Sequence, residues 1–138
     1  MKFTRNAHAV WQGGGKDGKG SLTTESGTLK ETPYSFKMRF ENEKGTNPEE
    51  LIGAAHSGCF TMQLAVYISE AGFTAESLKT NAEVTFENGS IPFIHLQLEG
   101  RIPGMNDDQF HELAMKAKEN CPVSKLLNAI ITLDEKLV

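Results

Sequence analysis

The sequence predicts an α+β fold in which antiparallel sheets pack against helices. Segments that alternate apolar and polar residues, as strands do, lie toward both ends of the chain, and a long segment with apolar residues every three or four positions, as in a helix, lies between them. Because the strands come in groups, antiparallel pairing is favoured over a doubly wound sheet. The length of 138 residues suits one domain, residues 1–138, with its own core.

The N-terminal part is expected to form strands joined by a glycine-rich loop. Residues 3–12 and 22–29 have strand-like patterns, and the sequence between them, GGGKDGKG, nearly matches a phosphate-binding loop. That motif requires Ser or Thr after Lys19, where this chain has Gly20, and a strand-like segment follows instead of a helix. We therefore expect a hairpin loop.

A further strand is expected at residues 34–40, where aromatic residues and a methionine alternate with polar residues. On this pattern alone, Arg39 is an ordinary arginine on the solvent face. The polar residues 41–45 then lead to the next element.

A long helix is expected within residues 45–72. Asn47 suits the N-cap, Pro48 suits the first helical position, Glu50 completes a capping-box pattern, and Gly72 provides the stop. The apolar residues expected to line one face are Ile52, Ala55, Cys59, Met62 and Val66.

The C-terminal half is expected to contain a hairpin, two helices and a last strand. Residues 78–88 and 91–102 alternate and flank the turn signal Asn88-Gly89. A helix follows at about residues 107–120. The final elements are a short helix with Cys121 at its N-cap and Pro122 as its first residue, and a strand at residues 129–136.

Composition argues against several classes of function. The net charge is −4 and no basic cluster is interleaved with aromatic residues, which disfavours nucleic acid or an acidic membrane surface as a partner. We expect no secretory signal, because no apolar segment follows Met1 closely, and no membrane span, because we expect no apolar run near the roughly 20 residues that one needs. The expected location is the cytoplasm.

The chain has two cysteines, Cys59 and Cys121. In a reducing compartment, such a pair is more often catalytic or redox-active than a structural disulfide. Composition alone favours the simpler interpretation of two buried, unpaired thiols.

A cysteine reacts as its thiolate, so a reactive Cys59 needs a group that lowers its pKa. The helix dipole gives no help in the middle of a helix. His56 is three residues away but is expected simply to occupy a semi-buried helical position. Arg39 is the better candidate because its charge is permanent, and Glu49 or Glu50 could orient it.

Geometry constrains this site. Glu49 and Cys59 are ten residues apart, or about 15 Å along a straight helix. Either the helix is broken near Gly53 or Gly58, or the site combines two chains. We prefer a dimer in which Arg39 and Glu49 of one chain approach Cys59 of the other.

Cys121 has a separate advantage, because free N–H groups at a helix N-cap stabilise a thiolate. The pair suggests a cycle in which one thiolate attacks a peroxide and becomes a sulfenic acid, which the second thiol converts to a disulfide.

Several segments closely resemble one family. Residues 39–62 (RFENEKGTNPEELIGAAHSGCFTM) and 121–134 (CPVSKLLNAIITLD), with AVWQGG and GKGSLTTESGTL near the N-terminus, resemble the OsmC branch of the OsmC/Ohr peroxidases over almost the whole chain. The resemblance implies an intertwined α+β homodimer, with two long cysteine-bearing helices at its centre and active sites at the subunit interface. It also implies reduction of hydroperoxides, preferably organic ones, to alcohols without metal or haem.

The resemblance assigns roles to four residues. It makes Cys59 the peroxidatic cysteine, Cys121 the resolving cysteine, and Arg39 and Glu49 the charged residues of the site. It implies no bound cofactor and an external dithiol reductant such as protein-bound dihydrolipoamide.

Two other functions are alternatives to a peroxidase. One is a non-catalytic dimeric module that binds a small molecule or senses redox state, and the other is a thiol hydrolase using Cys59 and His56.

Overall fold

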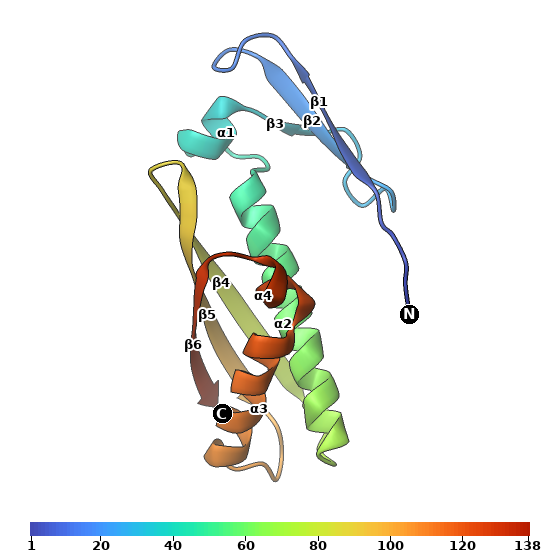
Figure 1. Cartoon of the computed structure of the whole chain (residues 1–138), viewed down its shortest axis with the longest axis vertical. Coiled ribbons are helices and arrows are strands. Elements are labelled where there is room, and N and C mark those ends of the chain that lie inside the picture. The colour runs from blue at the N-terminus through green and yellow to red at the C-terminus, as the bar shows by residue number, and fades with distance from the viewer. The chain divides into compact units, whose positions relative to one another are not determined.

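The computed structural model describes all residues, 1–138, and contains two compact units, residues 1–51 and 52–138. Each unit has one three-stranded sheet, β1-β2-β3 in the first and β4-β5-β6 in the second. The α+β class predicted from the sequence is confirmed. Figure 1 labels the elements.

The first unit is an antiparallel sheet followed by a short helix. The glycine-rich loop joins two antiparallel strands and is followed by a strand, so the predicted hairpin is confirmed. Gly20 is required in the second strand because a side chain there would overlap the rings of Trp11 and Tyr34, whose centroids lie 5.3 Å apart. The elements are β1 (Ala7–Gln12), β2 (Lys19–Thr24), β3 (Thr32–Tyr34) and α1 (Phe36–Phe40).

The strand predicted at residues 34–40 is wrong, because most of this segment is α1. The side chain of Ser35 accepts a hydrogen bond from the backbone N–H of Met38 at 3.2 Å and caps the helix. Phe36 and Phe40 then pack against each other, with ring centroids 4.9 Å apart, as residues four apart on a helix do. The same aromatic spacing fits a strand, so the pattern alone could not separate the two.

In the second unit, helices α2 and α3 cover one face of a sheet (Figure 1). Helix α2 begins in the last residues of the first unit and continues without a break. The elements are α2 (Pro48–Glu70), β4 (Ser77–Glu87), β5 (Ser90–Arg101), α3 (Asp107–Asn120), α4 (Pro122–Leu126) and β6 (Ile130–Leu137).

The predicted hairpin of β4 and β5 is confirmed. Asn88 and Gly89 both have positive φ angles, of 49° and 79°, as a tight two-residue turn requires. The expectation that all strands pair antiparallel is wrong for β6, which runs parallel to β5. The connection from β5 to β6 contains α3 and α4 and is long enough to return the chain to the same end of the sheet.

The core of the second unit lies between the sheet and the two helices. A side chain at Gly100 would lie 2.7 Å from the ring of Phe110, so glycine there allows α3 to pack closely on β5. The capping box predicted at Asn106 and Gln109 is present at the start of α3. The core residues are Phe60, Leu64 and Ile68 of α2, Ile94, Leu96 and Leu98 of β5, and Phe110, Ala114 and Ala117 of α3.

Helix α2 has the predicted ends. The side chain of Asn47 accepts a hydrogen bond from the backbone N–H of Glu50 at 2.8 Å. At the other end, Gly72 has a φ of 86°, and the backbone N–H of Phe73 bonds to the carbonyl of Ile68 at 3.1 Å, which forms a Schellman motif.

The face of α2 that packs into the core is only partly the predicted one, because Ile52 and Cys59 pack against the core but the other three predicted residues do not. Met62 and Val66 are 72% and 45% exposed, and Ala55 is exposed too. The helix is apolar on two sides, so periodicity could not identify which side faces the core. The side that does so contains Gly53, His56, Phe60, Leu64 and Ile68.

The apolar character of α2 also exceeds what the sequence led us to expect. Its mean hydropathy reaches 1.3 over an 18-residue window, of which 28% is buried, so by length and composition it could cross a membrane. A helix that contributes Phe60, Leu64 and Ile68 to a core fits the same description. Helix α2 therefore has a second apolar face in addition to the one that packs into the core.

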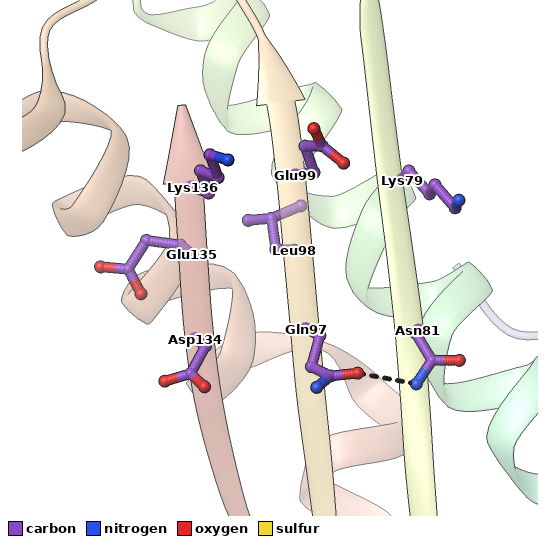
Figure 2. Close-up of a pocket in the computed structure, with 8 residues that line it drawn as sticks. All are labelled: Lys79, Asn81, Gln97, Leu98, Glu99, Asp134, Glu135 and Lys136. Atoms are coloured by element: carbon purple, nitrogen blue, oxygen red, sulfur yellow. Dashed lines mark hydrogen bonds between the residues drawn. The ribbon is translucent and has the colours of Figure 1, made fainter. Parts of the chain in front are cut away.

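The outer face of the β4-β5-β6 sheet is polar and contains a shallow pocket of about 360 Å³ (Figure 2). Asn81 of β4 donates a hydrogen bond to Gln97 of β5 at 3.0 Å across this face. Side chains of both charges surround the pair and are spread along the strands, as on an ordinary solvated sheet face. They are Lys79, Glu99, Asp134 and Lys136.

Candidate active site

The two cysteines lie in contact. The Sγ atom of Cys121 is 2.7 Å from the Sγ atom of Cys59, and both thiols are free. This distance is longer than the roughly 2.05 Å of a disulfide bond but requires only a small movement to reach it. The sequence could not establish this proximity.

Each cysteine is held by a different helix. Cys59 is half-buried in the middle of α2, and Cys121 is fully buried where α3 ends and α4 begins. Pro122 is the first residue of α4, as predicted. The core packing of α2 and α3 therefore determines where the two sulfur atoms meet.

A second contact, next to that of the two thiols, joins α2 to α4. Nε2 of His56 and Oγ of Ser124 are 2.8 Å apart and both side chains are buried. His56 precedes Cys59 by three residues and Ser124 follows Cys121 by three, so the two contacts lie one helical turn apart. We call this pair of contacts the α2–α4 seam.

The sequence underestimated His56 and missed Ser124. His56 is completely buried rather than semi-buried, and burial lowers the pKa of its imidazole, which favours the neutral form. The Nδ1 atom of His56 has no hydrogen-bond partner. The signal available in the sequence was the mirrored spacing, His-x-x-Cys in one segment and Cys-x-x-Ser in the other.

The pKa of Cys59 is raised from its ordinary value. Burial is the main cause and the contact with the Cys121 thiol adds to it, while the backbone N–H of Val123 acts in the opposite direction. The N-terminus of α4 therefore stabilises a thiolate on Cys59, whereas we expected it to serve Cys121. None of the causes is a cation, so a reactive Cys59 needs a positive charge from elsewhere.

Arg39 and Glu49 form an ion pair in the first unit. Nη2 and Nε of Arg39 donate to Oε1 of Glu49 at 2.8 and 3.0 Å, and Nε also approaches Oε2 at 3.3 Å. The Glu49 side chain is 15% exposed and that of Arg39 is 37% exposed. Such a paired contact fixes the plane of the guanidinium relative to the Glu49 carboxylate.

The continuity of α2 excludes one of the two arrangements that the sequence left open. The helix shows no break at Gly53 or Gly58. The broken-helix alternative is therefore wrong, and the arrangement with two chains stays a prediction.

The arrangement can perform thiol redox chemistry. Two free thiols in contact form a dithiol that can be oxidised to a disulfide and reduced again. The structure has no group of three or more His, Cys, Asp or Glu side chains arranged to hold a metal ion. The fold and the dithiol together define a thiol-based redox protein on an α+β scaffold.

Comparison with known proteins supports a narrower assignment. Residues 41–136 match the family described as OsmC-like protein. The chain is 48% identical over 141 aligned positions to peroxiredoxin OsmC of Escherichia coli (strain K12), with 99% of each chain covered. The chain therefore belongs to the OsmC family, as its resemblance predicted.

A more distant relative and a solved structure are also similar to this chain. The chain is 28% identical over 130 positions to the organic hydroperoxide resistance protein of Xanthomonas axonopodis pv. citri (strain 306), covering 89% of this chain and 87% of that one. The crystal structure of an OsmC-like protein from Mycoplasma pneumoniae has the same fold, with a TM-score of 0.79 at 15% identity and coverage of 100% and 99% of the two chains.

Proposed function

We propose that this protein is a thiol-dependent peroxidase that reduces hydroperoxides, preferably organic ones, to alcohols. The observation that carries the proposal is the contact between Cys59 and Cys121 at 2.7 Å. Membership of the OsmC family supports it, because one relative is named a peroxiredoxin and another an organic hydroperoxide resistance protein.

The first step oxidises Cys59. Its thiolate attacks the terminal oxygen of the hydroperoxide, a sulfur–oxygen bond forms, and the oxygen–oxygen bond breaks. The alkoxide leaves and takes a proton to become the alcohol. Cys59 is then a sulfenic acid, and the substrate has been reduced by two electrons.

The second step uses Cys121. Its sulfur attacks the sulfur of the Cys59 sulfenic acid, the disulfide forms, and hydroxide leaves with the thiol proton as water. An external dithiol, of the lipoyl type, then reduces the disulfide by thiol–disulfide exchange. A reducing cytoplasm would keep both thiols free between cycles.

Arg39 and Glu49 supply the missing electrostatics in this proposal. Arg39 of a second copy lowers the pKa of Cys59 and polarises the peroxide, while Glu49 holds the guanidinium in position. Their ion pair at 2.8 Å supports this role, because the guanidinium is already oriented before a thiolate binds.

The second apolar face of α2 supports a homodimer. Met62 and Val66 are exposed in one chain, on a helix whose other side is already in the core. Packing the α2 helices of two copies together would bury this face and form two equivalent sites. The apolar surroundings of such a site favour a hydroperoxide with an alkyl chain over hydrogen peroxide.

Steady-state assays test the function. With cumene hydroperoxide and dihydrolipoamide, the wild-type chain should consume dithiol over many turnovers, and Cys59→Ser should consume none. Consumption of no more than one equivalent would support a redox-sensing module instead. Ester cleavage that needs no dithiol and survives loss of Cys121 would support a hydrolase.

A further inference from the structure

The His56–Ser124 contact belongs to neither chemical step of the proposed function, yet it lies one turn from the two sulfur atoms. Both side chains are buried, and their polar atoms are 2.8 Å apart. We propose that this contact is a positioning device for the resolving step, which holds α4 against α2 so that Cys121 returns to Cys59 after oxidation. This inference rests on the proposed function.

The geometry of the seam is that of two helical segments in fixed register. The two segments run antiparallel. His56 of α2 contacts Ser124 of α4, and one turn further toward the C-terminus of α2, Cys59 contacts Cys121 at the N-terminal end of α4. Beyond His56, the apolar side chains of Ile52 and Leu127 line one pocket of about 380 Å³. A slip of α4 would therefore separate the thiols and break the His56–Ser124 contact together.

The thiol contact cannot hold this register through the cycle by itself. In the reduced chain, the Sγ atom of Cys59 lies 2.7 Å from that of Cys121. When Cys59 becomes a sulfenic acid, an added oxygen atom must fit beside the same sulfur. The contact between the sulfurs is then disturbed at the moment when Cys121 is needed. His56 and Ser124 change chemically at no stage, so their contact can persist.

Helix α4 depends on such outside support. It has five residues, and few hydrogen bonds hold it, among them those from the N–H groups of Lys125 and Leu127. A helix this short is not stable without packing against its surroundings. The partner of Ser124 on α2 is the polar part of that support.

The burial of His56 costs free energy, because one of its ring nitrogens has no hydrogen-bond partner, and this cost needs an explanation. Its Nδ1 atom is buried without a hydrogen-bond partner, although most buried polar groups in proteins have one. An apolar side chain would fill the same space without this penalty. A specific hydrogen bond from the ring to α4 explains why a histidine occupies the position.

The test separates the two steps. In Ser124→Ala, we expect the oxidation of Cys59 by cumene hydroperoxide to be little affected, while formation of the Cys59–Cys121 disulfide slows about tenfold, because small displacements of reacting atoms cost large factors in rate. More Cys59 should then reach the sulfinic acid at high peroxide. Stopped-flow fluorescence and intact-mass analysis measure the two effects.

Two further variants serve as controls. Ser124→Thr keeps the hydroxyl and should restore most of the resolving rate. Ile68→Val removes a buried methyl group from α2 three turns away and should leave the ratio of the two rates unchanged. If Ser124→Ala forms the disulfide as fast as wild type, or if Ile68→Val slows it equally, the proposal is wrong.

The positioning role can also be tested without peroxide. With oxidised glutathione as the probe, the Cys59 thiolate should attack one sulfur and release a glutathione thiolate, which leaves a mixed disulfide on Cys59. Attack by the Cys121 thiolate on Cys59 should then form the Cys59–Cys121 disulfide and release the second glutathione thiolate. Ser124→Ala should slow this resolution too, and His56→Gln, which can still reach Ser124, should slow it less. If the wild-type chain resolves glutathione but does not turn over peroxide, the proposed function fails while the seam is still tested.

Discussion

The Sγ atoms of Cys59 and Cys121 lie 2.7 Å apart, although 62 positions separate the two residues in the chain. Neither local helix places them together. The packing of α2 and α3 against the same sheet brings the middle of α2 to the point where α3 ends and α4 begins. The packing of the core of the second unit therefore positions the two cysteines next to each other.

We predict that Cys121→Ser permits the first oxidation but not the second. One equivalent of cumene hydroperoxide should add one oxygen to the chain, and excess peroxide should add a second as Cys59 becomes a sulfinic acid. Steady-state turnover with dihydrolipoamide should fall by at least about tenfold. Turnover at the wild-type rate would show that another group resolves the sulfenic acid.

Arg39→Gln should raise the pKa of Cys59, because a guanidinium close to a thiol favours the thiolate. The pH dependence of Cys59 alkylation by iodoacetamide, measured in Cys121→Ser, would report the shift. Lys37→Gln removes a positive charge from the same short helix α1 and is the matched control. Equal shifts in the two variants would indicate a general charge effect, with no specific role for the Arg39–Glu49 pair.

Met62→Arg should disrupt the proposed dimer, because it places a charge on the second apolar face of α2, where Met62 is 72% exposed. Sedimentation velocity should show a larger monomer fraction, and peroxidase activity should fall with it. Gln97→Arg adds the same charge to the polar outer face of the sheet (Figure 2) and should change neither property. A monomeric Met62→Arg with full activity would contradict a site shared between chains.

Stability should fall as the pH drops below about 6.5, the ordinary pKa of histidine, because of His56. Burial lowers the pKa of His56 in the folded chain, so between the two pKa values the unfolded chain binds the extra proton and is favoured. This contribution is complete above pH 6.5 and is lost as the pH falls toward the folded pKa.

Urea unfolding at pH 5 to 8 measures this effect. His56→Gln should show a shallower loss of stability at acidic pH than wild type, whereas His8→Gln, at an exposed position of β1, should keep the wild-type slope. Identical slopes for wild type and His56→Gln would contradict the burial of a neutral imidazole.

Features that depend on neighbouring residues were predictable from the sequence. The turn at Asn88-Gly89, the cap at Asn106 and the start of α4 at Pro122 each need only a few residues in a row, and the structure has all three. The pattern at residues 34–40 failed because Phe36 and Phe40 have a spacing that suits both a strand and a helix, and the Ser35 cap decided the outcome.

Features that depend on distant residues were not predictable from local patterns. Helix α2 is apolar on two sides, and only the arrangement of the core shows that Phe60 rather than Met62 faces the sheet. The partners of His56 and Cys59 lie in α4 and at its N-cap, more than 60 positions away. The resemblance to the OsmC family supplied the pairing of the cysteines but gave no indication of Ser124.

Intact-mass analysis of the reduced chain after one equivalent of cumene hydroperoxide tests the central claim most directly. We predict the loss of two hydrogens, reversed by a dithiol and absent from both Cys59→Ser and Cys121→Ser. An unchanged mass would contradict the account by showing that the thiols are inert toward hydroperoxides. A gain of oxygen without disulfide formation would contradict the role of Cys121 as the resolving cysteine.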